Sequence, residues 1–96
     1  MECKFHPKAE LELAKSINWY EKRSIKAKDA FLAELFTTID AIILNPNRFQ
    51  KMNNNFRFVP LNKFPFNIVY TLHEGNVFII SIFHNSRNPS IWTHRK

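Results

Sequence analysis

The amino-acid sequence predicts an α+β fold in which a helical hairpin packs on one face of a small, mainly antiparallel sheet. Two amphipathic segments with helical spacing follow one another in the first half of the chain, and three β-rich runs follow in the second half. The expected order of elements is therefore β-α-α-β-β-β. Because 96 residues suffice for one hydrophobic core but not for two, we expect a single domain over residues 1–96.

The first helix is predicted from the spacing of its apolar residues. Residues 1–6 have the pattern of a short first strand, which a proline ends. Leu13, Ile17 and Tyr20 then recur at helical intervals, with glutamates and lysines filling the opposite side. We expect this helix to end near residues 22–25.

A second helix is predicted almost immediately after the first. Phe31, Leu35 and Ile39 lie on one apolar stripe. Asn45 ends the helix, because a residue before a proline is disfavoured in helical conformation. The short connection implies an antiparallel helical hairpin. The polar, asparagine-rich residues 47–55 are predicted as a loop.

Three strands are predicted in the second half, at Phe56–Leu61, Phe64–Leu72 and Val77–His84. Residues 73–76 join the last two and contain Gly75, the only glycine of the chain. A sole glycine between two β-rich runs marks the one position that needs a positive φ, so we expect a tight hairpin there. The residues that alternate along these runs predict one sheet face buried under the helices and the other half-covered.

The positive charge is concentrated in the second half of the chain. Residues 1–40 contain seven acidic and seven basic residues, whereas residues 41–96 contain seven basic residues and one acid, Glu74. The net charge of +6 therefore lies entirely in residues 41–96. Such a surface attracts anionic partners, which can be nucleic acid, an acidic protein segment or solvent ions.

Several functional classes are disfavoured by composition. Cys3 is the only cysteine, so a disulfide framework is not expected, and the N-terminus has no signal-peptide pattern. No apolar run approaches the roughly 20 residues of a membrane helix. We therefore expect a cytoplasmic protein without membrane association. The four histidines lack the spacing of zinc ligands, and one glycine cannot form a phosphate loop, so neither a metal nor a cofactor is expected.

The candidate partner-binding residues are basic or aromatic. Four of them cluster at and after the end of the last strand, in the pattern His-x-x-Arg-x-Pro-x-x-Trp-x-x-Arg: His84, Arg87, Trp92 and Arg95. The other two, Arg57 and Lys63, precede them in the chain. A structural interpretation is open for the cluster: Arg87 and Arg95 can pair with helix acids such as Glu10, Glu12 or Glu34, Trp92 can cover the sheet, and His84 can be a hydrogen-bonded structural residue. Trp19 and Tyr70 are predicted as core aromatics with a satisfied polar tip.

The ordered set of motifs resembles the RelE/ParE superfamily of bacterial toxins over essentially the whole chain. The strongest pieces are the Phe-Pro-Phe-x-Ile-x-Tyr run over residues 64–70 and the His-x-x-Arg-x-Pro-x-x-Trp run over residues 84–92. Both look more like the ParE, plasmid-stabilisation branch. The resemblance implies the toxin of a type II toxin–antitoxin pair, held inactive by a cognate antitoxin whose helical, flexible tail wraps it.

The two branches of this superfamily imply different targets. ParE-like members are similar to proteins that block DNA gyrase by protein–protein binding, without a known active site. RelE-like members cut messenger RNA in the ribosome.

A ribonuclease needs a proton-transfer group and cations that stabilise the phosphorane. Here His84 would transfer protons, and Arg57 and Arg87 would be the cations, one on each of two strands that this interpretation places close together. The predicted central strand has no arginine or lysine, however, and a catalytic face without cations binds phosphate poorly. The sequence therefore favours a gyrase inhibitor without catalytic residues, with the ribosome-dependent endoribonuclease as the alternative.

Overall fold

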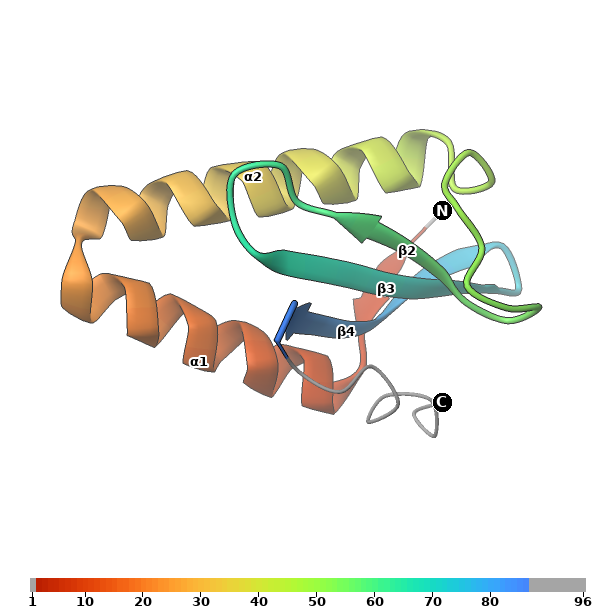
Figure 1. Ribbon diagram of the computed structural model, residues 1–96. Helices are drawn as coiled ribbons and strands as arrows, with labels where there is room; N and C mark the ends of the chain where they lie inside the picture. Colours follow the sequence, from red (N-terminus) through yellow and green to blue (C-terminus); the bar gives the residue numbers. More distant parts are fainter. Residues whose placement is uncertain (1, 87–96) are drawn as a thin grey trace.

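The computed structural model describes residues 2–86, and its elements follow the predicted order (Figure 1). They are β1 (Cys3–Phe5), α1 (Pro7–Arg23), α2 (Ile25–Leu44), β2 (Arg57–Pro60), β3 (Phe66–His73) and β4 (Asn76–His84). The two helices pack against a mixed, four-stranded sheet, which confirms the predicted α+β architecture.

One serine joins the two helices. The backbone of Ser24 is extended, and its N–H donates to the Tyr20 carbonyl at 2.8 Å, which ends α1. The Ser24 hydroxyl accepts the Ala27 N–H at 3.2 Å and so caps α2. At the other end of the hairpin, Asn45 ends α2 as predicted. The helices diverge from this joint, and the strands lie across the opening between them (Figure 1).

The strand order is β1-β4-β3-β2, with β1 parallel to β4 and the other pairs antiparallel. β1 is only three residues long because Pro7 begins α1 directly after it. β1 therefore pairs with β4 only at Val77, Phe78 and Ile79. In the described part of the chain, the remaining half of β4 has no neighbouring strand on that side.

The β3–β4 turn differs from the prediction at one residue. Both Glu74 (φ 51°) and Gly75 (φ 78°) have positive φ, whereas only the glycine was expected to. A two-residue hairpin loop of this kind needs a positive φ at both central positions. Glu74 therefore adopts a backbone conformation that is unfavourable for a residue with a Cβ atom.

Two strands begin later than predicted. β2 begins at Arg57, one residue after the predicted start, and β3 begins at Phe66, two residues after it. The residues directly before β3 form a loop whose backbone groups are hydrogen-bonded locally. Phe66 donates its N–H to the Phe64 carbonyl at 2.8 Å, and Pro65 has no N–H to donate to a ladder.

Hydrophobic clusters lie on both faces of the sheet. The larger one joins apolar residues of the helices, such as Phe31 and Leu35 of α2, to sheet residues such as Ile68, Tyr70 and Ile82. The opposite face was expected to be half-covered. Four of its residues are at most 7% exposed: Phe56, Val69, Ile80 and Phe83. Phe58 and Phe78 pack against these four residues. The second face is therefore a small core of its own.

Candidate functional site

Arg57, a predicted partner-binding residue, is held within the fold. It is half-buried and lies opposite Tyr70 on the helix side of the sheet. Its Nη1 donates to the Phe49 carbonyl at 2.7 Å and to the Asn47 carbonyl at 3.1 Å. These bonds fix the segment after α2 against β2, so the guanidinium acts structurally here.

Tyr70 is a core residue, as predicted, and its polar tip is satisfied. The ring is fully buried, and the hydroxyl donates to the Pro46 carbonyl at 2.5 Å. Burial raises the pKa of the Tyr70 phenol above its usual value of 10.0, and the positive charge of Arg57 offsets part of this rise. The arginine and the tyrosine thus anchor the same loop from neighbouring strands.

Lys63 lies in the loop before β3 with its side chain exposed. Its backbone makes the contact that matters, because the Lys63 and Asn62 N–H groups donate to the two oxygens of Glu34 at 3.0 and 2.5 Å. The Glu34 carboxylate therefore ties this loop to α2 by accepting backbone hydrogen bonds.

His84 ends β4 and is half-buried, with its ring edge-on to Phe66 at 5.2 Å between centroids. The Ser86 N–H donates to Nδ1 at 3.1 Å, and the Ser86 hydroxyl lies 2.8 Å from the same atom. Because Nδ1 accepts the backbone hydrogen bond, the neutral ring carries its proton on Nε2. That nitrogen has no hydrogen-bond partner within residues 2–86.

The structure does not bring Arg57 and His84 together. Arg57 lies opposite Tyr70, and His84 lies opposite Phe66, with β3 between them. At the usual strand dimensions, the two residues are separated by about 13 Å along β3 and about 10 Å across it. Arg57 and His84 are therefore too far apart to contact one phosphate group, and the expected proximity of Arg57 to Arg87 stays a prediction. The other predicted residues, Arg87, Trp92 and Arg95, lie outside the described part of the chain.

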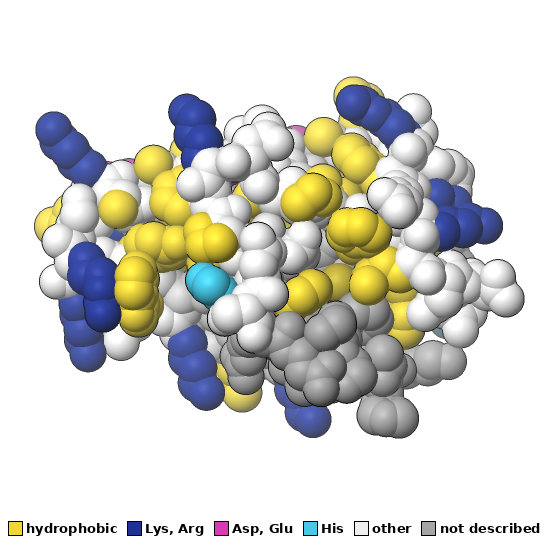
Figure 2. All heavy atoms as spheres, viewed as in Figure 1, with side chains coloured by type: hydrophobic (Ala, Val, Ile, Leu, Met, Phe, Trp, Pro, Cys, Tyr) yellow, Lys and Arg dark blue, Asp and Glu magenta, His cyan; other side chains and the backbone are white. Residues whose placement is uncertain are grey.

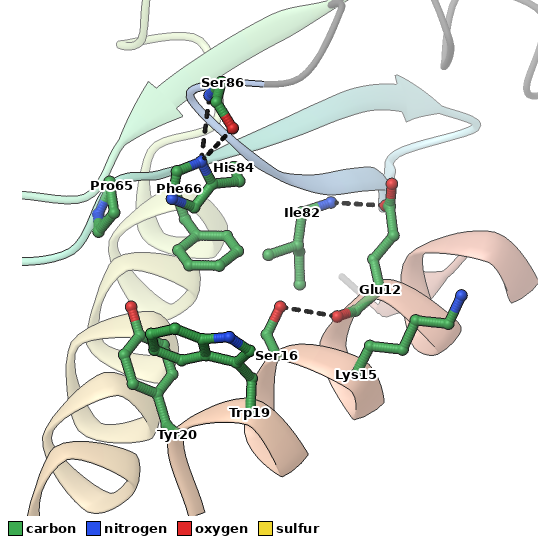
Figure 3. A pocket seen from close by; sticks show the side chains of 10 residues that line it. All are labelled: Glu12, Lys15, Ser16, Trp19, Tyr20, Pro65, Phe66, Ile82, His84 and Ser86. Atoms are coloured by element: carbon green, nitrogen blue, oxygen red, sulfur yellow. Dashed lines mark hydrogen bonds between the residues drawn. The ribbon is translucent and has the colours of Figure 1, made fainter. Parts of the chain in front are cut away.

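A groove of about 410 Å³ lies between α1 and the end of β4 (Figure 3). Its apolar floor is formed by Tyr20, Phe66 and Ile82, and its walls by Trp19 from α1 and His84 from β4. The rest of its lining is mainly polar: Glu12, Lys15, Ser16, Pro65 and Ser86. Of the residues that line this groove, only His84 was predicted from the sequence to bind a partner.

Trp19 is the most accessible aromatic residue of the groove, which corrects its prediction as a core residue. It is 51% exposed, and the guanidinium of Arg23 lies over its ring at 3.6 Å. The arginine also donates to the Trp19 carbonyl at 3.0 Å. A large apolar surface with a cation stacked on it suits a partner that is both apolar and acidic.

Glu12 borders the same groove and has a role that the sequence did not reveal. Its Oε1 accepts the Ile82 N–H at 3.1 Å and the Ser81 hydroxyl at 2.9 Å. The carboxylate thereby covers part of the β4 edge where β1 is absent. Like Glu34, this helix acid accepts backbone hydrogen bonds from the sheet layer, and its expected pairing with Arg87 or Arg95 lies outside the described residues.

The charge on the surface in Figure 2 is predominantly positive. Hydrophobic side chains cross the middle of this face, lysines and arginines surround them, and scarcely any acidic side chain of the described residues is visible. This face matches an anionic, partly apolar partner.

Two further classes of site were searched for in residues 2–86. No group of three or more histidine, cysteine, aspartate or glutamate side chains there has the geometry to hold a metal ion. Neither α1 nor α2 combines the length and the hydropathy of a membrane-spanning helix.

Comparison with known proteins identifies the class of this fold. A solved chain described as "Chromosomal ParDE TA system from P. aeruginosa" superimposes with a TM-score of 0.70, at 18% sequence identity. The match covers 88% of this chain and 95% of that one. A comparison with curated proteins found no significant match.

The sequence shows to which family this chain belongs. The model of the family described as "ParE toxin of type II toxin-antitoxin system, parDE" matches residues 3–89. This chain therefore belongs to the ParE toxin family, and it is a ParE-like toxin of the type II class. Membership of a toxin–antitoxin family implies an antitoxin as its partner.

Proposed function

We propose that this protein inhibits DNA gyrase by protein–protein binding in the cytoplasm and that its cognate antitoxin neutralises it. The observation that carries the proposal is the family match over residues 3–89. The positively charged face of Figure 2 supports it, because gyrase bound to DNA presents an anionic surface.

The geometry gives less support to the alternative, a ribosome-dependent endoribonuclease. Catalysis by Arg57 and His84 would require both to reach one phosphate group. Arg57 instead donates to the carbonyls of Asn47 and Phe49. His84 pairs with Phe66 at the start of β3, four residues before Tyr70, which pairs with Arg57. β3 itself carries no arginine or lysine that would bind an RNA backbone between them.

For the antitoxin, we propose that an amphipathic helix binds the outer face of the helical hairpin. Large apolar side chains are exposed there, including Leu11 at 60%, Ile25 at 63% and Phe36 at 48%. Phe36 also borders a groove of about 370 Å³ between the helices, which Phe5, Leu13 and Ile17 line. An exposed apolar surface of this kind on a small protein is typical of a partner site.

The test is the toxicity of a His84→Gln variant expressed in bacterial cells, measured beside the wild type. Glutamine retains a hydrogen-bonding side chain but cannot transfer protons as imidazole does. We expect growth arrest to persist with DNA breaks and intact messenger RNA. Loss of toxicity with retained antitoxin binding, together with codon-positioned RNA cuts by the wild type, would replace the proposal by the nuclease.

A further inference from the structure

Within residues 2–86, no strand pairs with the edge of β4 beyond the point where β1 stops. β1 reaches only Ile79 of β4, and the segment that follows β1 adds one backbone hydrogen bond, from the His6 N–H to the Ile79 carbonyl at 2.9 Å. From there the chain turns into α1, and β4 continues for five more residues to His84. This half of the strand is a sheet edge inside the groove between α1 and β4.

The hydrogen-bond ladder fixes which backbone groups face this edge. Asn85 donates its N–H to the Pro65 carbonyl at 2.9 Å, and the Phe66 carbonyl accepts the Leu61 N–H at 2.9 Å. In an antiparallel pair, adjacent residues direct their backbone groups to opposite sides. His84, which lies opposite Phe66, therefore directs its N–H and carbonyl away from β3.

Ile82 has the same orientation, two residues earlier in the strand. Its N–H donates to Glu12, which lies on the edge side and not on the β3 side. The Ile82 carbonyl must then face the edge as well. Neither this carbonyl nor the His84 N–H has a hydrogen-bond partner among the described residues. A donor and an acceptor at strand spacing are thus available in the groove.

The side chains around this edge define what can bind there. Trp19 offers an exposed apolar surface across the groove from His84 (Figure 3). The guanidinium of Arg23 lies over the Trp19 ring. Lys15 adds a second positive charge at the groove, while the only acid, Glu12, is bonded to Ser81 and Ile82. The groove therefore favours a segment with an apolar side chain and acidic neighbours.

We propose that an extended, acidic segment of the antitoxin adds to β4 as a further strand in this groove. An extended segment has free backbone groups that can pair with the His84 N–H and the Ile82 carbonyl, whereas a helix has none to offer. An apolar side chain of the segment packs on Trp19, and its carboxylates face Lys15 and Arg23. This inference rests on the proposed function, because it takes the antitoxin as the partner.

The first test removes the edge donor without removing a bond from the free toxin. Proline at position 84 lacks the N–H, and proline is tolerated where a strand N–H faces away from the sheet. His84→Ala is the matched control, because it also loses the imidazole but keeps the N–H. We expect the antitoxin to dissociate about five- to tenfold faster from His84→Pro than from His84→Ala. Equal dissociation rates would overturn the proposal.

Hydrogen exchange on the wild-type protein decides the question even if the proline variant does not fold. We expect the amide proton of His84 to exchange much more slowly in the complex than in the free toxin. An exchange rate that is unchanged on binding would overturn strand addition.

The acidic character of the segment has its own test. We expect Lys15→Glu to speed antitoxin dissociation several-fold more than Lys51→Glu, which makes the same charge change at an exposed position between α2 and β2, outside the groove. Equal effects would overturn it.

These outcomes separate the inference from the proposed function. A wild-type toxin that binds no antitoxin and leaves gyrase untouched contradicts the function itself. A wild-type toxin that inhibits gyrase and is neutralised, with equal behaviour of the two position-84 variants, contradicts only the added strand.

Discussion

Replacing Arg57 by methionine should destabilise the fold. Methionine keeps an unbranched apolar stem but removes the guanidinium, which donates to the Phe49 carbonyl at 2.7 Å and the Asn47 carbonyl at 3.1 Å. Hydrogen bonds from a charged donor contribute about 1.5–3 kcal/mol each. Because Arg57 is only half-buried and water can reach the vacated carbonyls, we expect a total loss of about 2–3 kcal/mol in the free energy of unfolding.

This magnitude is readily measured. For a domain of this size, about 1 kcal/mol shifts Tm by roughly 4–8 °C, so Arg57→Met should lower Tm by roughly 10–20 °C. Urea unfolding followed by circular dichroism should give a lower midpoint with an unchanged slope. Lys63→Met is the control, because it removes the same charge from an exposed side chain and should change stability by less than about 0.5 kcal/mol.

The result that would refute this reasoning is specific. If Arg57→Met unfolds at the same urea concentration as the wild type and yet loses toxicity, the arginine contacts the target and its bonds to the loop are dispensable.

Four further substitutions test other parts of the structure. Glu34→Gln should lower the free energy of unfolding by about 1–2 kcal/mol in urea titrations, because an amide has one acceptor oxygen where the carboxylate binds two backbone N–H groups; an unchanged midpoint would mean that the loop is not tied to α2. Above about pH 10 the unfolded chain releases the Tyr70 proton while the fold, in which burial raises the pKa of this phenol, retains it, so stability should fall as pH rises through this range. Tyr70→Phe should show a shallower fall in Tm between pH 9 and pH 11, and an identical slope would contradict the burial of a protonated phenol. Gly75→Ala should cost about 1–2 kcal/mol because alanine is strained at a φ of 78°, whereas Glu74→Gly at a φ of 51° should be neutral or stabilising by thermal unfolding; the opposite order would contradict the turn geometry.

The elements of this fold could be predicted because their signals are local. The stripe of Leu13, Ile17 and Tyr20 and the proline after Asn45 act within a few residues, and they define the helical hairpin. Gly75 marks the one tight hairpin for the same reason.

The site could not be predicted in the same way, because its contacts are distant in sequence. Glu12 meets Ile82 across 70 residues, and Glu34 meets Asn62 across 28, so neither contact leaves a periodic pattern. The open edge of β4 arises because β1 is three residues long, which depends on where a helix begins elsewhere in the chain. The loop contacts of Arg57 could not be predicted, because residue type alone does not tell which side of a strand a guanidinium faces; its role in partner binding stays a prediction.

The central claim is that this ParE-family toxin acts on gyrase, and the most direct measurement is a supercoiling and cleavage-complex assay with purified toxin and gyrase. The account predicts loss of supercoiling and accumulation of gyrase-linked DNA breaks, both reversed when the antitoxin is added. Full supercoiling activity at a toxin concentration that arrests growing cells would contradict it.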